Sequence, residues 1–206
     1  MVGCPRMTVF QFADALNVSR ETLARLEIYE AMLREWQKTI NLVSDGSLED
    51  VWRRHFLDSG QLCRLILGAK TITDIGSGGG FPGLIVAIIS DIYVTLVEAD
   101  NRKAAFLREV SRATGANTKI IAGRAETVSA TPAEVVTARA VAPLTKLLAL
   151  VEPWIQPRGR CYFLKGTTVE DELTDASRIW DIEYDMVPSL SDPSGTILCV
   201  KEFGRV

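Results

Sequence analysis

The segment with the clearest chemical meaning is glycine-rich: residues 74–83 read DIGSGGGFPG. It directly follows a short run of β-forming residues, so it should connect a strand to a helix. Glycines there allow positive φ angles and remove the β-carbons that would keep a ligand away from the backbone. Pro82 suits the first turn of the helix, where its missing N–H costs nothing. The segment therefore predicts free backbone N–H groups and a helix N-terminus at the carboxyl end of a sheet, an arrangement typical of nucleotide-binding sites.

A carboxylate, Glu98, stands where a second strand should end, roughly 20 residues beyond the loop. In α/β nucleotide-binding folds, a carboxylate at this point accepts hydrogen bonds from the hydroxyls of an adenosine ribose. A glycine triplet alone can be a simple turn, and an acidic residue after a strand is usually solvated. Their combination after the first strand of an α/β unit favours a ligand site.

Two ligands fit this pattern. Gly78, Gly80 and Gly83 satisfy the G-x-G-x-x-G spacing, so NAD is one candidate. Asp74 favours the other, S-adenosylmethionine, because a carboxylate at the head of the loop would repel a pyrophosphate but attract an ammonium or sulfonium cation. We therefore predict that the loop holds the amino-acid end of S-adenosylmethionine and that Glu98 holds its ribose. The predicted loop contacts are Asp74, Gly76, Gly78 and Gly80.

A possible acid–base pair occurs earlier in the chain. His55 and Asp58 are three residues apart, so they would share one face of a helix, with Arg54 beside them. Such a pair could transfer protons, although a lone histidine is more often a structural group. Both interpretations remain open from the sequence.

Arg139 is a further candidate. It follows a predicted inner strand and lies between two alanines, where it would be buried without a partner unless it faces the cleft. It could hold a carboxylate of the ligand or of another residue, or a phosphate of the substrate.

The first third of the chain should be helical and form an N-terminal extension, residues 1–66. Apolar residues recur at helical spacing from residue 9 to 16, and Ser19 has the position of an N-cap for a longer helix that reaches residue 40. Ser47 and Asp50 have the spacing of a capping box, which predicts a third, short helix through residue 57.

From residue 71 onward, short β-type runs alternate with helical stretches. Five of the runs alternate in this way, which predicts parallel strands with helices on both faces. The last two are joined by turn residues 188–195, which predicts an antiparallel return at one edge. The expected strands are residues 71–75, 93–97, 118–121, 135–137, 160–164, 182–187 and 197–201. We therefore expect a single domain, residues 1–206, with a doubly wound, seven-stranded, mostly parallel α/β core over residues 67–206.

The composition is that of one globular domain, with 206 residues, 47% of them hydrophobic and 24% charged. The four cysteines form no C-x-x-C pair and a single histidine cannot complete a zinc site, so we expect reduced thiols and no structural metal. The most apolar stretch, residues 81–89, is too short for a membrane span, and the start lacks a signal-peptide pattern. We expect a cytoplasmic protein with no membrane partner.

The formal net charge of −3 argues against nucleic acid as a partner, but it conceals two segments of opposite sign. Residues 102–146 contain eight basic and three acidic side chains, whereas residues 167–192 contain eight acidic side chains and one basic. Solvated helix faces explain many such charges, yet the separation indicates different roles for the two surfaces.

Several motifs, in order along nearly the whole chain, resemble those of the glucose-inhibited division protein B family. They are NLVS (41–44), RHFLDS (54–59), DIGSGGGFPG (74–83), LVEADNRKAAFLREV (96–110), GRAE (123–126), TARAVAPL (137–144) and LKG (164–166). The resemblance implies a class I methyltransferase fold with a helical extension. It also implies methylation of N7 of one guanine in 16S rRNA by S-adenosylmethionine. By the same resemblance, the donor contacts would be Gly76, Phe81, Ala125, Glu126 and Arg139.

This reaction needs no general base, because guanine N7 carries an in-plane lone pair and no proton. The enzyme must position N7 in line with the methyl group and tolerate a positive charge that moves to the base, a role we assign to Arg139. The expected partner is 16S rRNA or the small ribosomal subunit. The candidate RNA contacts are Arg53, Arg54, His55, Arg102, Lys103 and Lys165.

One segment departs from the family pattern. Residues 192–202 read DPSGTILCVKE, without the basic residues that relatives commonly carry before the last strand, which leaves the C-terminal share of RNA binding open. Two alternative functions also remain open. They are a methyltransferase acting on a small molecule or a protein, and a non-catalytic module that binds NAD.

Overall fold

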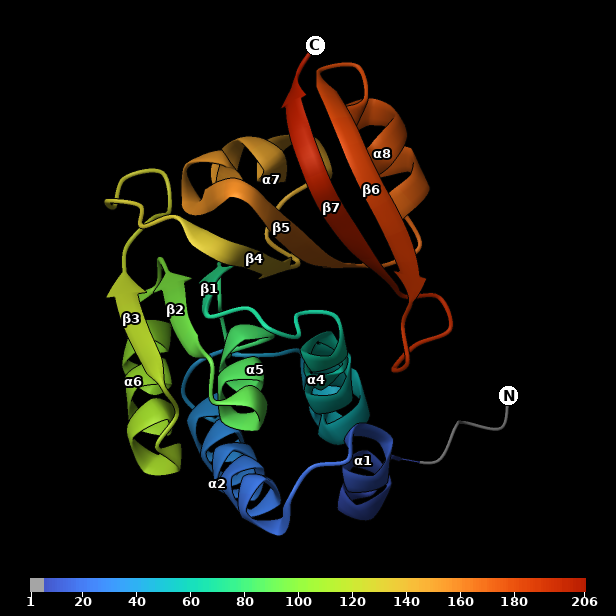
Figure 1. Cartoon of the computed structure of the whole chain (residues 1–206). Helices are drawn as coiled ribbons and strands as arrows, with labels where there is room; N and C mark the ends of the chain where they lie inside the picture. The colour runs from blue at the N-terminus through green and yellow to red at the C-terminus, as the bar shows by residue number, and fades with distance from the viewer. Residues whose placement is uncertain (1–5) are drawn as a thin grey trace.

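The computed structural model describes residues 6–206 (Figure 1). Cys4 lies outside the described residues, and Cys63, Cys161 and Cys199 are free thiols. No helix among the described residues is long and apolar enough to cross a membrane. In the same part of the chain, no group of three or more His, Cys, Asp or Glu side chains is arranged to hold a metal ion.

The N-terminal segment is helical, as predicted, with one correction. Helix α1 (Val9–Leu16) is followed by α2 (Arg20–Gln37), whose predicted N-cap, Ser19, accepts a hydrogen bond from the Thr22 N–H at 3.2 Å. The predicted capping box at Ser47 is wrong, because Ser47 lies inside the short helix α3 (Asp45–Leu48). The expected third helix is a π-helix, η1 (Trp52–Leu57), that continues into α4 (Asp58–Gly60) and the 3₁₀ turn η2 (Gln61–Arg64).

Seven strands form one sheet in the order β3-β2-β1-β4-β5-β7-β6. Their bounds are β1 Thr71–Ile75, β2 Tyr93–Glu98, β3 Thr118–Ala122, β4 Ala133–Arg139, β5 Ile155–Lys165, β6 Trp180–Pro188 and β7 Thr196–Arg205. The first five pair in parallel, and β7 runs antiparallel to both β5 and β6. The predicted number of strands, the parallel and antiparallel pairings and the fold class are confirmed. Strands β4 to β7 are longer than predicted.

The helices cover the sheet on two faces (Figure 1). Alternate residues of each inner strand point to opposite faces, so Ile72 and Leu96 pack with α2, α5 (Gly83–Ser90) and α6 (Asn101–Thr114). Ile75 and Val97 pack with α7 (Leu144–Val151), η3 (Glu152–Trp154) and α8 (Val169–Ala176). The N-terminal helices therefore share one core with α5 and α6.

The strand order reverses beside β1, since β2 lies on one side of it and β4 on the other. In open α/β sheets, ligands bind at the carboxyl ends of the strands at such a reversal. The loop after β1 and the residues that end β2, β3 and β4 meet at this point.

Candidate active site

The glycine-rich loop joins β1 to α5 at the carboxyl end of the sheet. Gly76, Gly78 and Gly80 have φ angles of 67°, 55° and 95°, the left-handed backbone that the sequence predicts. A β-carbon on Gly76 would lie 2.7 Å from Cγ2 of Val141, so only glycine fits there without a shift. Pro82 is the N-cap of α5 rather than its first residue, which places it one position before the predicted site.

Glu98, the last residue of β2, is fixed by two backbone donors. Its Oε2 accepts a hydrogen bond from the Gly78 N–H at 2.7 Å, and its Oε1 accepts one from the Asp100 N–H at 2.8 Å. Each carboxylate oxygen keeps a second lone pair. Glu98 thus ties the loop to β2 and can still accept hydrogen bonds from two hydroxyls of a ribose.

A pocket of about 220 Å³ lies beside the loop, at the ends of β1, β2 and β3. Gly76, Ala99, Ala125 and Glu126 contribute to its walls. The indole N–H of Trp154 donates to the backbone carbonyl of Ala125 at 3.3 Å and holds this part of the wall in place. The structure therefore brings three of the predicted donor contacts to one small pocket.

Asp74 lies below the loop and is fully buried. Its Oδ1 accepts a hydrogen bond from the Thr137 hydroxyl at 2.7 Å, whereas its Oδ2 has no hydrogen-bond partner. Burial raises the pKa of Asp74 to about 6, against the opposing effect of hydrogen bonds led by that from Thr137. A buried carboxylate oxygen without a partner is costly, and a ligand cation held by the loop would lower that cost.

Arg139, the last residue of β4, is bound by the N-terminal extension. Its Nη2 donates to Nδ1 of His55 at 2.9 Å, and its Nη1 donates to Oδ2 of Asp58 at 3.3 Å and to the backbone carbonyl of Arg54 at 3.2 Å. The guanidinium also lies 5.0 Å from the centre of the Phe81 ring, in cation–π geometry. The sequence leaves three kinds of partner open for Arg139. In the structure, Arg139 binds the carboxylate of another residue, Asp58.

His55 is held in one neutral form. Because Arg139 can only donate, Nδ1 of His55 accepts, and Nε2 carries the proton and donates to Oγ of Ser47 at 2.8 Å. Burial lowers the pKa of His55 to about 3, helped by the positive charges of Arg139 and Arg54. Both ring nitrogens are engaged, so His55 takes part in a structural network instead of a proton-transferring pair with Asp58.

Phe81 is 3% exposed and stacks between two rings. Its centroid lies 5.4 Å from that of Tyr29 and 4.8 Å from that of His55. The ring is therefore a platform under Arg139 and His55. The predicted free N–H groups of the loop are wrong at five positions: Gly76 and Ser77 donate to the Val97 carbonyl, Gly78 donates to Glu98, and Gly80 and Phe81 donate to the Ser77 carbonyl.

A second pocket, of about 340 Å³, is lined by Arg139 and Ala140, whereas the next residue, Val141, lines the first. The loop between β6 and β7 closes one side of it. The Ser191 hydroxyl donates to Oδ1 of Asp58 at 2.7 Å, and Arg54 forms an ion pair with Asp192 at 2.7 Å. Asp192, the first residue of the segment that departs from the family pattern, and the preceding Ser191 thus connect the β6–β7 loop to the N-terminal extension. Five side chains around this pocket and its contact with the extension were not predicted from the sequence. They are Ser47, Gln61, Ser189, Ser191 and Asp192.

The predicted RNA contacts differ in their accessibility. Lys165 is 9% exposed and pairs with Glu172 at 2.7 Å, so its ammonium is not presented to solvent. Arg53 pairs with Asp50 at 3.0 Å. Arg102, at the start of α6, is 73% exposed.

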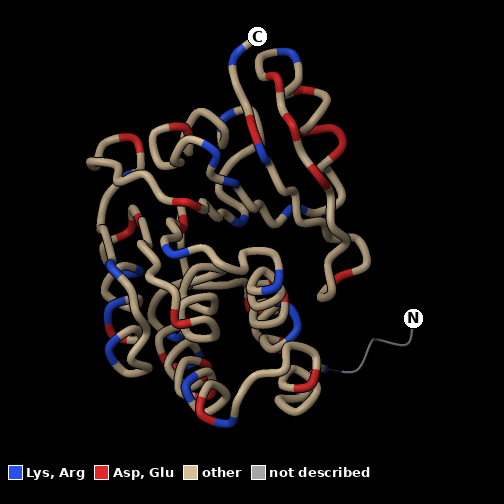
Figure 2. Tube along the Cα trace, in the orientation of Figure 1, with Lys and Arg blue, Asp and Glu red and all other residues tan. Residues whose placement is uncertain are grey.

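The basic segment does not form a single face. Its residues on α6 lie on one side of the sheet and Lys146 on α7 lies on the other, because the helices change face where the strand order reverses between β3 and β4. By contrast, the acidic segment stays together on α8 and β6 (Figure 2).

Solved structures of low sequence identity share the fold. An O-methyltransferase from Bacillus cereus in complex with SAH matches with a TM-score of 0.61 and 15% identity, over 92% of this chain and 94% of that chain. M. jannaschii TYW2 in complex with AdoMet matches with a TM-score of 0.54 and 15% identity, over 82% and 80% of the two chains.

Relatives of known family match over almost the whole chain. "Ribosomal RNA small subunit methyltransferase G" of Rhodospirillum centenum is 50% identical over 96% of this chain and 92% of its own length. The protein of the same name from Gluconobacter oxydans is 49% identical over 92% of this chain and 98% of its own length. The family model described as rRNA small subunit methyltransferase G matches residues 22–196. The chain therefore belongs to the rRNA small subunit methyltransferase G family, in agreement with the resemblance of its motifs.

Proposed function

We propose that this protein transfers a methyl group from S-adenosylmethionine to N7 of a guanine in 16S rRNA. The observation that carries the proposal is the pair of pockets at the end of β4, the larger lined by Arg139 and Ala140 and the smaller by the next residue, Val141. Class I methyltransferases need two adjoining sites, one for the donor and one for the acceptor, at the carboxyl ends of the strands.

The residues around the smaller pocket fit the donor. Glu98 would hold the ribose hydroxyls, and the turn containing Ala125 and Glu126 would border the adenine. The unpaired Oδ2 of Asp74 below the loop suits the cationic amino group of the donor. When bound, S-adenosylmethionine supplies a methyl group on a positively charged sulfur.

The larger pocket suits the acceptor base. It is bounded by Asp58, Arg139 and the β6–β7 loop, so a purine that has left its stack could enter between fixed polar groups. Asp58, held by Arg139 and Ser191, contributes a carboxylate whose charge would favour the developing positive charge on the base.

Proton transfer has no place in this mechanism. N7 of guanine attacks through a lone pair that carries no proton, and His55 offers no unengaged nitrogen to act as a base. The chain's contribution is therefore alignment of the base and the donor, together with the electrostatics of the cleft.

Exposed basic residues would guide the RNA. Arg102 and Lys103 at the start of α6, together with Arg54 at the cleft rim, remain candidates for phosphate contacts, whereas the paired Lys165 would keep the cleft wall in place. We propose a cytoplasmic enzyme whose substrate is 16S rRNA or the small subunit that contains it.

Two experiments test the proposal separately for donor and acceptor. Calorimetry should show binding of S-adenosylmethionine and none of NAD; tight NAD binding without a response to S-adenosylmethionine would contradict the donor assignment. Mapping of rRNA from cells that lack the protein should show one guanine of 16S rRNA without its N7 methyl group. An unchanged 16S rRNA, with label from the donor entering protein or a small molecule instead, would favour the alternative methyltransferase functions.

A further inference from the structure

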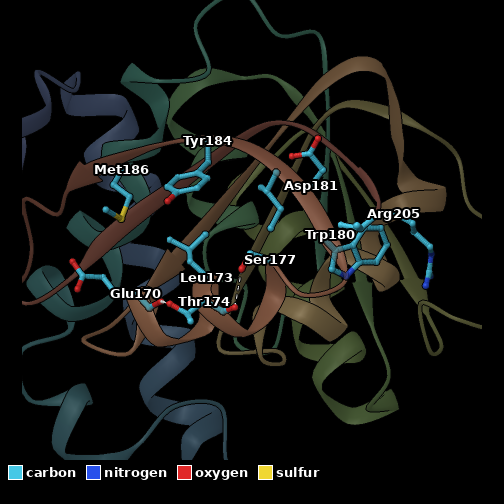
Figure 3. A pocket seen from close by; sticks show the side chains of 11 residues that line it. Glu170, Leu173, Thr174, Ser177, Trp180, Asp181, Tyr184, Met186 and Arg205 are labelled. Atoms are coloured by element: carbon cyan, nitrogen blue, oxygen red, sulfur yellow. Dashed lines mark hydrogen bonds between the residues drawn. The ribbon is translucent and has the colours of Figure 1, made fainter.

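A large groove of the described structure lies far from the donor pocket, between α8 and β6. We call it the acidic groove: a space of about 810 Å³ lined by residues that include Glu170, Leu173, Asp181, Tyr184, Met186 and Arg205 (Figure 3). β6 and β3 are the two opposite edges of the sheet, and the donor pocket lies toward β3. The proposed methyl transfer makes no use of this groove.

The groove presents apolar side chains to solvent. Tyr184 and Met186 are 40% and 45% exposed and, two residues apart on one strand, point to the same face. Figure 3 shows the Tyr184 side chain directed toward Leu173 of α8, whereas the Asp181 carboxylate points away from it. Large apolar side chains gathered in a groove with polar margins are typical of a binding surface for another chain.

The edge of β6 is open for a further strand. Within residues 6–206, β6 has a strand neighbour on one side only, β7. The other side carries backbone N–H and C=O groups over a strand of 9 residues. An extended peptide that adds to such an edge gains main-chain hydrogen bonds and places alternate side chains on the two faces.

The carboxylates of β6 favour a basic peptide as the added strand. Lys201 pairs with both Glu183 and Asp185, at 3.5 Å and 3.0 Å, which leaves one negative charge in excess. Asp181 shares the face of Glu183 and Asp185 and takes part in no ion pair in the described part of the chain. Arg205, the basic side chain that lines the groove, stacks on Trp180 and pairs with Glu152 at 4.0 Å. A second copy of β6 would place carboxylates opposite carboxylates, so like-charge repulsion disfavours self-pairing and a basic strand is the complementary partner.

We propose that the acidic groove binds an extended, lysine- or arginine-rich polypeptide segment. The segment adds to the edge of β6, places its alternate apolar side chains against Tyr184 and Met186, and directs its basic side chains to the opposite face, toward Asp181, Glu183 and Asp185. This interaction is independent of the methyl-transfer proposal, and it would anchor a basic protein next to the enzyme without covering the donor pocket.

The test uses a synthetic nine-residue peptide in which lysine alternates with valine, and a control peptide in which glutamate replaces lysine. The full chain should bind the lysine peptide at low salt, with hydrogen-exchange protection confined to β6 and its flanks, and should not bind the glutamate peptide. Protection elsewhere, or equal binding of both peptides, would overturn the proposal.

Matched variants show whether the groove itself is responsible. Removing two carboxylates of β6 with Asp181→Asn and Glu183→Gln should raise the Kd for the lysine peptide about fivefold. The control, Asp14→Asn with Glu27→Gln, makes the same charge change at exposed positions of α1 and α2 and should leave the Kd unchanged. Equal effects of the two double variants would show attraction to net charge alone and would contradict the proposal.

The apolar part of the site has its own variant. Tyr184→Ser with Met186→Ser keeps the charge and should also weaken binding of the lysine peptide, while S-adenosylmethionine binding stays at the level of the unmodified chain. Undiminished peptide binding by this variant, or a dimer of the unmodified chain that the variant abolishes, would refute the assignment.

Discussion

The pH dependence of stability offers a quantitative test of the network around His55. Burial and the nearby guanidinium groups lower its pKa from 6.5 to about 3, so the folded protein leaves His55 neutral where the unfolded chain protonates it. Between these two values the unfolded state binds more protons, and stability must therefore fall as the pH falls. The slope approaches about 1.4 kcal/mol per pH unit, which gives a loss of roughly 2 to 3 kcal/mol between pH 7 and pH 4.5.

The buried Asp74 has the opposite effect on stability. Because its pKa is raised to about 6 in the folded state, the folded state binds more protons than the unfolded state below that pH, and this group makes stability rise as the pH falls. The comparison that isolates His55 is thus between the unmodified chain and His55→Gln, in which the Asp74 effect is the same. Urea unfolding at pH 7 and pH 4.5 should show that the unmodified chain loses roughly 2 to 3 kcal/mol more than the variant.

The chain contains one histidine, so its imidazole proton resonance in untagged protein needs no assignment. This resonance should keep its neutral chemical shift down to about pH 4. Parallel unfolding curves for the two proteins, or a titration midpoint near 6.5, would refute the assignment of a buried, neutral His55.

Further substitutions test the site residues. Glu98→Ala should weaken S-adenosylmethionine binding by about 1 to 3 kcal/mol in calorimetry, and an unchanged affinity would remove Glu98 from the donor site. Arg139→Ala should reduce single-turnover methyl transfer about tenfold or more while costing about 1 to 2 kcal/mol of unfolding free energy, whereas a purely structural arginine would show the reverse. Gly76→Ala should lower the unfolding free energy by about 1 to 3 kcal/mol, because of its positive φ and the close Val141 side chain, and wild-type stability would contradict that geometry. Folded His55→Gln should retain methyl transfer, and its complete loss would restore a role as a base.

The sequence was sufficient for the sheet and for the donor side of the cleft. Strand periodicity and the glycine spacing depend on local chemistry, so β1, the loop and Glu98 could be placed from neighbouring residues alone. The donor-side turn with Ala125 and Glu126 followed from the family resemblance.

The acceptor side depends on contacts between distant segments. Arg54 and Asp192 are 138 positions apart, and Ser191 and Asp58 are 133 apart, so no local pattern indicates either pair. The turn at residues 52–57 is π-helical, yet His55 and Asp58 both contact Arg139, in agreement with the shared face expected from their spacing. Lys165 is a candidate RNA contact from the sequence, but in the structure it pairs with Glu172 of the following helix, α8, and is only 9% exposed.

The most direct measurement of the proposed function is methyl transfer to defined acceptors. The purified chain is incubated with S-adenosylmethionine carrying a labelled methyl group and with either unmodified 16S rRNA or small subunits assembled from it. The label should appear as N7-methylguanosine at a single position after nuclease digestion, and Glu98→Ala should reduce it. Label in another nucleoside, or no label in RNA from a chain shown to bind the donor, would contradict the account.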